Sequence, residues 1–276
     1  MNPEPTPRPP TPELVKLEGV GNDFLVLLDP DGTDISAGPD LARAACDRHL
    51  GFGADGLIRA RRAPEGTDAV LVFELWNADG SEAEMSGNGM RCMAHAALDA
   101  GMVEAGVAFG VLTPAGRRSV TISPTAAPGT TWARVDMGQP KVIGSADRCN
   151  VGHGQLLVNM GNPHLVVAGP DPAGVDVAGL GAMLEASEPG GLNVEFATLG
   201  PGPDEVTMRV WERGVGETQA CGTGSCAAAV AFHHWGRVGR AVTVHQPGGS
   251  VAVEWRPDGT VVLSGPSRRI GRCSLS

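Results

Sequence analysis

Several kinds of residue are scarce in this 276-residue chain, and each scarcity excludes a class of function. Tyrosine is absent and aromatic residues make up only 4% of the sequence, which argues against the stacking platforms that bind single-stranded nucleic acid. Basic residues are outnumbered, and the net charge of −10 opposes binding to phosphate backbones and anionic membranes. No apolar run approaches the ~20 residues needed to cross a bilayer. We therefore expect neither nucleic acid nor membrane as a partner.

Paired cysteine motifs are also missing. The six cysteines form no Cys-x-x-Cys pair and no zinc-ligand spacing, so no metal site is expected. Residues 1–12 are rich in proline and lack the basic-then-apolar pattern of a secretory signal. We read them as a disordered tail, and we expect a cytoplasmic protein whose cysteines remain thiols. At 42% apolar and 19% charged, the remainder has the composition of a globular protein.

The most informative feature present is a repeated motif. Ser86-Gly87-Asn88-Gly89 precedes an apolar run that is typical of a helix, and Cys221-Gly222-Thr223-Gly224 does the same 135 residues later. Trp76 and Trp211 recur at the same offset. The length alone allows one large domain or two, but such a repeat predicts two related halves, each presenting one reactive position to a shared cleft.

The pattern along the chain supports two equivalent halves. Each half carries apolar strand candidates bounded by glycine- or proline-containing turns, and each carries one helix that is apolar on nearly all sides and must be enclosed. We expect strands to wrap this central helix. The expected strands include 14–17, 24–28, 69–76, 154–160, 192–198, 206–211, 251–255 and 260–263, and the expected helices are 41–48, 90–100, 180–186 and 226–232, with a short tail from residue 265.

A reactive side chain before Gly-x-Gly at a helix start has a clear chemical use. Glycines allow a ligand to approach the backbone, and the free N–H groups of the first turn point outward. The helix dipole adds about half a positive charge there, which suits a carboxylate and lowers the pKa of a nearby thiol. Two such ends facing one cleft would grip one carboxylate and leave Ser86 and Cys221 on opposite faces of the adjacent carbon.

Each motif also has a simpler interpretation. A lone Ser86 would most often be a helix N-cap, and a lone buried Cys221 an inert small hydrophobe. The duplication in matched settings favours a functional role for both. Gly-x-Gly by itself is weak evidence for nucleotide binding, and the chain has no phosphate-loop lysine and no Gly-x-Gly-x-x-Gly between strand and helix.

Longer motifs carry a specific resemblance. They run in order over nearly the whole chain and comprise Gly21-Asn22-Asp23-Phe24, Gly53-Ala54-Asp55-Gly56, Asn77-Ala78-Asp79-Gly80-Ser81-Glu82, Gly87-Asn88-Gly89, Gly161-Asn162-Pro163-His164, and Glu212-Arg213-Gly214 through Cys221-Gly222-Thr223-Gly224. In these motifs the chain resembles the diaminopimelate epimerase family. The resemblance implies an isomerase that needs no cofactor (no pyridoxal phosphate) and interconverts LL- and meso-diaminopimelate for lysine and peptidoglycan synthesis.

The resemblance also implies a fold of the α/β (α+β) class. Two pseudo-symmetric domains, each a mostly antiparallel sheet around a central helix, would enclose the active site between them. We expect an N-terminal half at 13–125, joined by 264–276, and a C-terminal half at 126–263. A homodimer is the family's expected assembly.

Site residues are implied by position within the matched motifs. Catalysis would fall to Cys221 and Ser86, supported by His164 and Glu212. Gly87, Asn88, Gly222 and Thr223 would hold the carboxylate at the reacting centre. The remaining substrate-binding residues, mainly for the distal amino-acid end, would be Asn22, Asn77, Asn162, Asn193, Glu212 and Arg213, a set in which a guanidinium and neutral amides suit a zwitterion.

The chain departs from the family at one reactive position, where Ser86 replaces a cysteine. A serine hydroxyl is a poor base near neutrality without help, and Cys92 lies on another side of the helix. Serine–cysteine pairs do occur in related proline-racemase-like enzymes. Three readings stay open: a diaminopimelate epimerase using Ser86, an epimerase or dehydratase of another amino acid, and a catalytically impaired diaminopimelate-binding protein.

Overall fold

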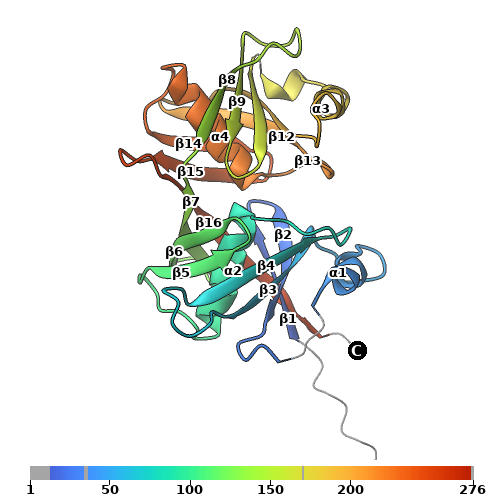
Figure 1. The fold of residues 1–276 in the computed structure, drawn as a ribbon, viewed down its shortest axis with the longest axis vertical. Coiled ribbons are helices and arrows are strands. Elements are labelled where there is room, and N and C mark those ends of the chain that lie inside the picture. Colours follow the sequence, from blue (N-terminus) through green and yellow to red (C-terminus); the bar gives the residue numbers. More distant parts are fainter. Residues whose placement is uncertain (1–12, 34–36, 170, 275–276) are drawn as a thin grey trace, which may run out of the picture.

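Two similar lobes are joined by a pair of strands in the computed structural model, which describes residues 13–33, 37–169 and 171–274 (Figure 1). The expected tail at 1–12 lies outside the described residues. The N-terminal lobe contains β1 (Glu13–Gly19), β2 (Asn22–Leu28), α1 (Pro39–Cys46), β3 (Gly56–Arg62), β4 (Leu71–Asn77), α2 (Gly87–Asp99), β5 (Phe109–Thr113), β6 (Gly116–Pro124) and β7 (Thr130–Gly138).

The C-terminal lobe repeats this order of elements. It contains β8 (Lys141–Ser145), β9 (Gly154–Asn159), β10 (Pro163–Ala168), the short 3-10 helix η1 (Pro172–Gly174), α3 (Val177–Ala186), β11 (Asn193–Leu199), β12 (Glu205–Glu212), β13 (Gly216–Thr218), α4 (Gly222–His234), β14 (Ala241–Gln246) and β15 (Gly249–Trp255). The last strand, β16 (Val261–Ser274), starts beside β15 and runs on along β7 and β1 of the N-terminal lobe. The helices α2 and α4 occupy the same place in their lobes, and α1 and α3 lie on the same side of the molecule (Figure 1).

Strand pairing repeats between the lobes as well. Most neighbouring strands are antiparallel, but β2 with β3 and β4 with β5 are parallel, and so are β10 with β11 and β12 with β14. Each parallel pair is connected by a helix, as parallel strands require. The expectation of mostly antiparallel sheets wrapped around a central helix is confirmed.

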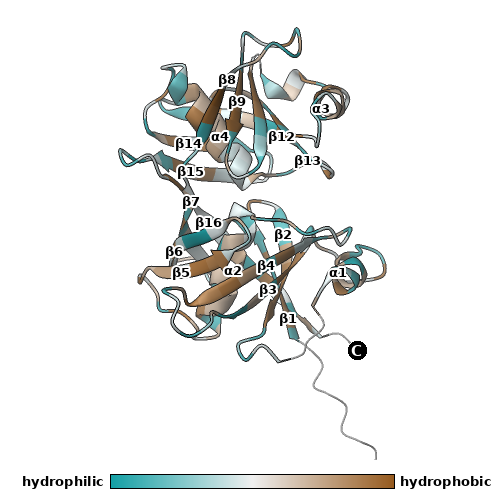
Figure 2. Ribbon diagram, viewed as in Figure 1, coloured by the Kyte–Doolittle hydropathy of each residue, from teal (hydrophilic) through white to brown (hydrophobic). Residues whose placement is uncertain are grey.

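Burial explains why α2 and α4 are central. Every residue from Gly87 to Ala97 and from Gly222 to Phe232 is buried, so strands must cover each helix on all sides. The strands that face them are strongly hydrophobic, as the brown colour of β4, β5 and β9 shows (Figure 2). Smaller apolar clusters lie under α1 and α3 on the outer faces of the sheets.

The end of the chain differs from the expectation drawn from the residue pattern. Residues from 265 onward were expected to form a short tail, but they continue the strand β16 to Ser274. Residues 261–264 of β16 pair with β15 on one side, residues 261–268 pair with β7 on the other, and the outer part pairs with β1, Glu13 lying opposite Ser274. Backbone pairing with two distant strands stabilises a segment whose own polar sequence does not indicate a strand. The sheet is thereby continuous through both lobes.

Candidate functional site

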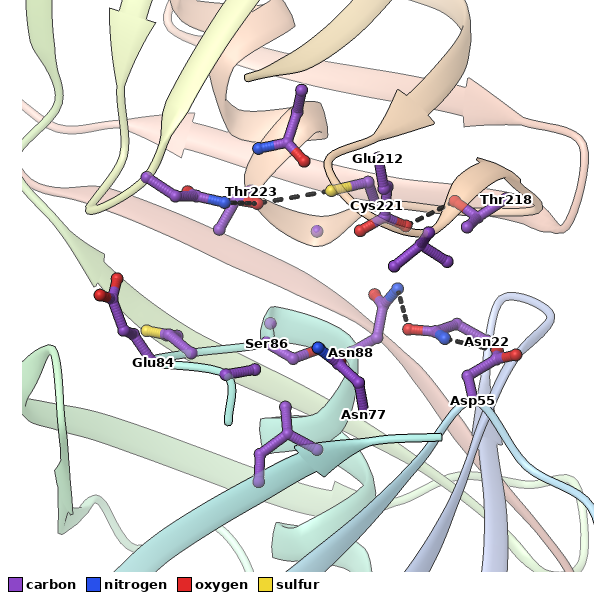
Figure 3. Close-up of a pocket in the computed structure, with 18 of the residues that line it drawn as sticks. Asn22, Asp55, Asn77, Glu84, Ser86, Asn88, Glu212, Thr218, Cys221 and Thr223 are labelled. Carbon is purple, nitrogen blue, oxygen red and sulfur yellow. Dashed lines mark hydrogen bonds between the residues drawn. The ribbon is translucent and has the colours of Figure 1, made fainter. Parts of the chain in front are cut away.

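A cleft between the lobes collects the residues that the motifs had indicated (Figure 3). Its walls come from the ends of β4 and β12 and from the starts of α2 and α4. All of the sequence-predicted site residues except His164 line it: Asn22, Asn77, Ser86, Gly87, Asn88, Asn162, Asn193, Glu212, Arg213, Cys221, Gly222 and Thr223. Residues 135 apart in the chain thus face a common space.

The two reactive side chains cap the two central helices in the same way. Ser86 precedes α2 with extended backbone (φ −138°, ψ 121°), and its Oγ accepts a hydrogen bond from Gly89 N–H at 3.0 Å. Cys221 precedes α4 with nearly the same backbone (φ −122°, ψ 120°), and its Sγ accepts from Gly224 N–H at 3.3 Å. Ser86 is therefore an N-cap, as its simpler interpretation held, and it also faces the cleft.

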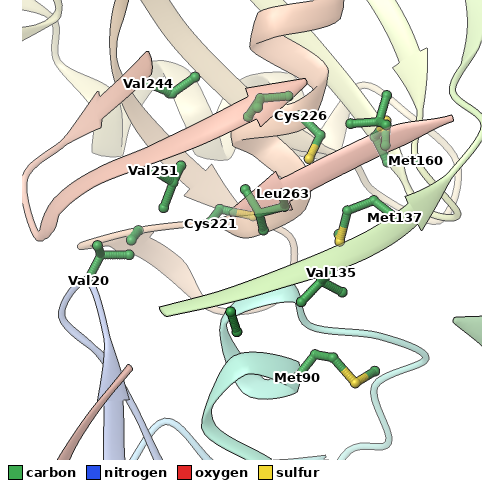
Figure 4. Packing of buried hydrophobic residues seen from close by; sticks show 14 of the residues in the cluster. Val20, Met90, Val135, Met137, Met160, Cys221, Cys226, Val244, Val251 and Leu263 are labelled. Carbon is green, nitrogen blue, oxygen red and sulfur yellow. The ribbon is translucent and has the colours of Figure 1, made fainter. Parts of the chain in front are cut away.

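The glycines after the caps bring the two helix starts into contact. A Cβ atom added to Gly222 would lie 3.1 Å from the Cα of Gly87 and 3.3 Å from the N atom of Asn88. Leu263 on β16 packs behind both glycines, since its Cδ2 would lie 2.5 Å from a Cβ at position 87 and 3.0 Å from one at position 222 (Figure 4). Two positive helix ends therefore meet at one point.

The environment of Cys221 differs from what the helix start alone predicts. We expected the helix dipole to lower the thiol's pKa. Instead, burial raises the pKa of Cys221 well above its ordinary value, and the negative charges of Glu212 and Glu195 raise it further, while hydrogen bonds with Thr223 and Gly224 offset only part of this. Desolvation and two carboxylates outweigh one helix end. In the free protein the side chain is a neutral thiol.

Glu212 has its carboxyl group within hydrogen-bonding reach of that thiol. Burial raises its pKa, and hydrogen bonds from Thr218 and Cys221 counter part of the rise. Figure 3 shows the Glu212 side chain beside Cys221 in the upper wall of the cleft. A carboxyl group with a raised pKa against a thiol is suited to exchange a proton with it.

His164 lies one layer behind the cleft wall. It is fully buried, its Nδ1 lies 2.6 Å from Glu195 Oε1, and its Nε2 lies 2.9 Å from Asn162 Oδ1. Asn162 in turn donates to Thr223 Oγ1 at 3.5 Å. His164 therefore reaches the cleft through Asn162, which bonds Thr223 at the start of α4.

Glu195 was missed in the sequence. Its side chain is completely buried and its Oε2 atom has no hydrogen-bond partner within the described part of the chain. The available signal was an acidic residue within the apolar run Leu192–Thr198, because a carboxylate is rarely buried without a specific partner.

The expected substrate-binding amides divide into two kinds. Asn22 uses both ends of its amide internally: Nδ2 donates to Asp55 Oδ2 at 2.6 Å, and Oδ1 accepts from Asn88 Nδ2 at 3.1 Å. Asn193 donates to Pro163 O at 3.0 Å and accepts from Arg213 N–H at 3.1 Å. These two residues fix the cleft wall and the backbone that carries Arg213.

Asn77 and Arg213 are the more accessible members of the set. Asn77 donates to Ser81 Oγ at 3.0 Å, and Arg213 is exposed at the rim. Asp55, which was not singled out as a site residue, also lines the cleft and bonds Arg48 at 2.7 Å.

The structure also bears on metal sites and on membrane-spanning segments. Within residues 13–33, 37–169 and 171–274, no cluster of three or more His, Cys, Asp or Glu side chains is arranged to hold a metal ion. No helix in the same ranges is long and apolar enough to cross a membrane.

Solved structures define the class of fold. The chain matches a phenazine biosynthesis protein of the PhzF family from Bacillus anthracis with a TM-score of 0.75 at 14% identity, covering 97% of this chain and 100% of that one. It matches a hydroxyproline epimerase from Agrobacterium vitis with a TM-score of 0.75 at 16% identity, covering 96% and 92%. The protein therefore has the two-lobed fold of these proteins.

Sequence comparison narrows the class to a family. The family model described as diaminopimelate epimerase matches residues 14–143 and 156–270. A diaminopimelate epimerase from Desulfitobacterium hafniense is 38% identical, covering 92% of this chain and 95% of the relative. An O-ureido-serine racemase from Streptomyces lavendulae is 39% identical, covering 94% and 93%. The chain belongs to the diaminopimelate epimerase family, and it is an isomerase.

Proposed function

We propose that this protein interconverts LL- and meso-2,6-diaminopimelate, for lysine and peptidoglycan synthesis, by moving the proton on one α-carbon from one face to the other without a cofactor. One observation carries the proposal: Ser86 and Cys221 cap two helices whose starts touch at Gly87 and Gly222 within one cleft. The family and the named relatives supply the substrate.

The α-carboxylate of the substrate would bind at the two helix starts. The first-turn N–H groups of α2 and α4, at Gly87, Asn88, Gly222 and Thr223, point toward the cleft and carry the positive ends of both dipoles. A carboxylate held there fixes its own α-carbon between the hydroxyl of Ser86 and the thiol of Cys221.

Proton transfer follows from the protonation states. Cys221 is a neutral thiol in the free protein, so it first passes its proton to Glu212 beside it. The thiolate then takes the substrate's α-proton from one face while the hydroxyl of Ser86 gives its proton to the other face. Solvent returns a proton to the Ser86 oxygen and removes one from Glu212, and the reverse direction retraces the same steps. His164 would support the pair by holding Asn162 against Thr223.

The distal amino-acid end would lie along the far wall of the cleft. Arg213 can pair with a carboxylate through two parallel hydrogen bonds, and Asn77 can bind the same zwitterionic end, as can Asn162 through the amide hydrogen that it does not donate to Thr223. Asn22 and Asn193 would act by fixing these neighbours, because their amides are already bonded within the protein.

A second candidate function concerns the substrate. The relative named O-ureido-serine racemase is as similar to this chain as the diaminopimelate epimerases are. A racemase of an amino acid with a different distal group would use the same helix starts and reactive pair. A third possibility, binding without catalysis, is raised by Ser86 in place of cysteine.

One experiment separates the three. Purified protein in D₂O is incubated with LL-diaminopimelate, meso-diaminopimelate or O-ureido-serine, and α-deuterium incorporation is followed by NMR. We expect rapid exchange and interconversion with the diaminopimelate isomers, and loss of both in Cys221→Ala and Ser86→Ala proteins. Exchange confined to O-ureido-serine would favour the second function, and binding without any exchange would favour the third.

We further propose a cytoplasmic homodimer that binds a small amino acid and neither nucleic acid nor membrane. The net charge of −10 supports the absence of polyanionic partners. Trp132 on β7 and Ile270 on β16 are 42% and 53% exposed, and such apolar surface favours contact between copies. Sedimentation equilibrium tests the dimer, and a Trp132→Arg protein should shift it toward monomer.

A further inference from the structure

Arg91, on the second turn of α2, stands out because its charge makes no direct ion pair within the described residues, although the carboxylate of Glu18 acts on it from farther away. It is the largest fully buried side chain in the described part of the chain, at 0% exposure. No carboxylate oxygen of residues 13–33, 37–169 or 171–274 lies within 4.0 Å of its guanidinium nitrogens. Burying a charge without an opposite charge is costly, so the position requires a physical reason.

The guanidinium of Arg91 lies against the first turn of α2, the helix that carries it. Its Nη2 donates to Asn88 Oδ1 at 2.9 Å, its Nη1 to Gly87 O at 3.4 Å, and its Nε to Pro266 O on β16 at 3.1 Å. A helical side chain points toward the N-terminal end of its helix, which explains this placement. The charge therefore lies directly behind the helix start where the carboxylate is proposed to bind.

Arg91 also fixes a link across the cleft floor. Guanidinium nitrogens only donate hydrogen bonds, so the oxygen of the Asn88 amide must face Arg91 and its Nδ2 must face the other way. That Nδ2 donates to the carbonyl oxygen of Ala220 at 3.1 Å. Ala220 immediately precedes Cys221 in the C-terminal lobe. The orientation of one amide thus connects α2 to the backbone of the reactive thiol.

Comparison of the two repeated motifs shows that the buried cation lies behind the first helix start and not behind the second. The position equivalent to Arg91, 135 residues later, is Cys226, which is also fully buried but carries no charge, since burial raises its pKa to about 12. The carboxyl groups of Glu195, which is fully buried, and of Glu212 lie on the Cys221 side instead. The cleft floor is therefore positive behind Ser86 and negative beside Cys221.

We propose that Arg91 is a positioning residue whose counter-ion is the α-carboxylate of the substrate, and that it also locks Asn88 across the cleft. This rests on the proposed function. When the α-proton leaves for Ser86 or Cys221, the C–H bonding pair delocalises into the carboxylate, which gains negative charge. A fixed cation behind the helix start stabilises that state more than the bound substrate.

The test compares ligands that differ only in charge at the reacting end. Dissociation constants are measured by calorimetry for meso-diaminopimelate and for its analogue with a carboxamide at the reacting centre, with wild-type, Arg91→Met and Arg91→Lys proteins. Cys226→Ala is the control for disturbed packing behind a helix start. The preference for carboxylate over carboxamide is the readout, because a purely structural loss would weaken both ligands alike.

We expect the preference to fall by about tenfold or more in Arg91→Met, and to stay at the wild-type level in Cys226→Ala. Arg91→Lys keeps the positive charge but loses the planar guanidinium that donates several hydrogen bonds at once. It should therefore keep the preference for the carboxylate ligand and have a lower kcat. An unchanged preference in Arg91→Met overturns the proposal. If that protein does not fold, loss of the preference in Arg91→Lys with kcat unchanged overturns it. Wild-type protein that binds neither ligand contradicts the proposed function instead.

Discussion

Replacing Gly222 by alanine should separate activity from stability. The added Cβ would lie 3.0 Å from Leu263 Cδ2, 3.1 Å from Gly87 Cα and 3.3 Å from Asn88 N, whereas carbon atoms prefer about 3.5–4.0 Å. The leucine can rotate away, but the backbone of α2 must move by a few tenths of an ångström. The first-turn N–H groups of α2 and α4 would then no longer be placed to bind one carboxylate together.

The expected effects on stability and on activity can be estimated separately. Overpacking costs about 1–3 kcal/mol, and replacing a helical glycine by alanine returns up to about 1 kcal/mol, so the net loss of stability should be about 1 kcal/mol. That lowers Tm by about 2–4 °C. Because a misplacement of about 1 Å costs roughly 100-fold in rate, a shift of a few tenths of an ångström should lower kcat/KM for diaminopimelate by about 3- to 10-fold.

A second glycine supplies the matched comparison. A Cβ at Gly87 would be closest to side-chain atoms, Leu263 Cδ2 at 2.5 Å and Met137 Cε at 3.2 Å. Adding Leu263→Val should therefore restore much of the activity that Gly87→Ala loses, and the Leu263→Val protein alone serves as the reference for the double variant. The same combination with Gly222→Ala should not restore activity, because the backbone contacts with α2 remain.

The assay is α-proton exchange in D₂O, with thermal unfolding measured on the same samples. Gly271→Ala is the control, since a Cβ there meets no atom within 4 Å. Wild-type kcat/KM in the Gly222→Ala protein would show that the contact between the helix starts does not set the carboxylate site.

Three further predictions follow from single residues. Ser86→Cys should make activity sensitive to diamide and recoverable with dithiothreitol, while the wild type withstands the same treatment; equal sensitivity of both proteins would contradict a facing pair. Because burial and two carboxylates raise the pKa of Cys221, its alkylation by iodoacetamide should be slower at pH 8 than that of a free cysteine and still be rising above pH 9. Burial raises the pKa of Asp23, but ion pairs with Arg48 at 2.8 Å and Lys16 at 3.0 Å outweigh burial and lower the pKa below its usual value. The stability that the Asp23 carboxylate contributes is therefore present above pH ~4 and is lost as the pH falls further. Asp23→Asn should cost about 1–2 kcal/mol in urea unfolding at pH 7, and a difference of the same size at pH 2 would refute the assignment.

The duplicated pattern made the centre of the molecule predictable. Both central helices follow from apolar runs after Gly-x-Gly, and α2 and α4 begin at Gly87 and Gly222, a few residues before the apolar positions that indicated them. The cleft lining also followed, because matched motifs at strand ends and helix starts must face each other once the halves pair.

What could not be predicted depends on distant partners. The sequence of β16 beyond residue 264 resembles a tail because its outer residues, such as Arg268 and Arg272, are polar, and only pairing with β7 and β1 makes it a strand. The raised pKa of Cys221 required knowing that Glu195 and Glu212 are packed beside it. No local pattern reveals that Arg91 is enclosed without a carboxylate, since a charged residue on a helix is usually exposed.

The path of β16 also constrains the order in which the protein can be built during synthesis. The N-terminal lobe is translated first, yet β1 and β7 acquire their shared neighbour only when β16 emerges, after every strand of the other lobe. Until then, edges of the early sheet stay open, and open edges invite pairing with other chains. The nascent protein therefore cannot complete its lobes one after the other; a ribosome stalled before residue 261 would hold an unfinished first lobe.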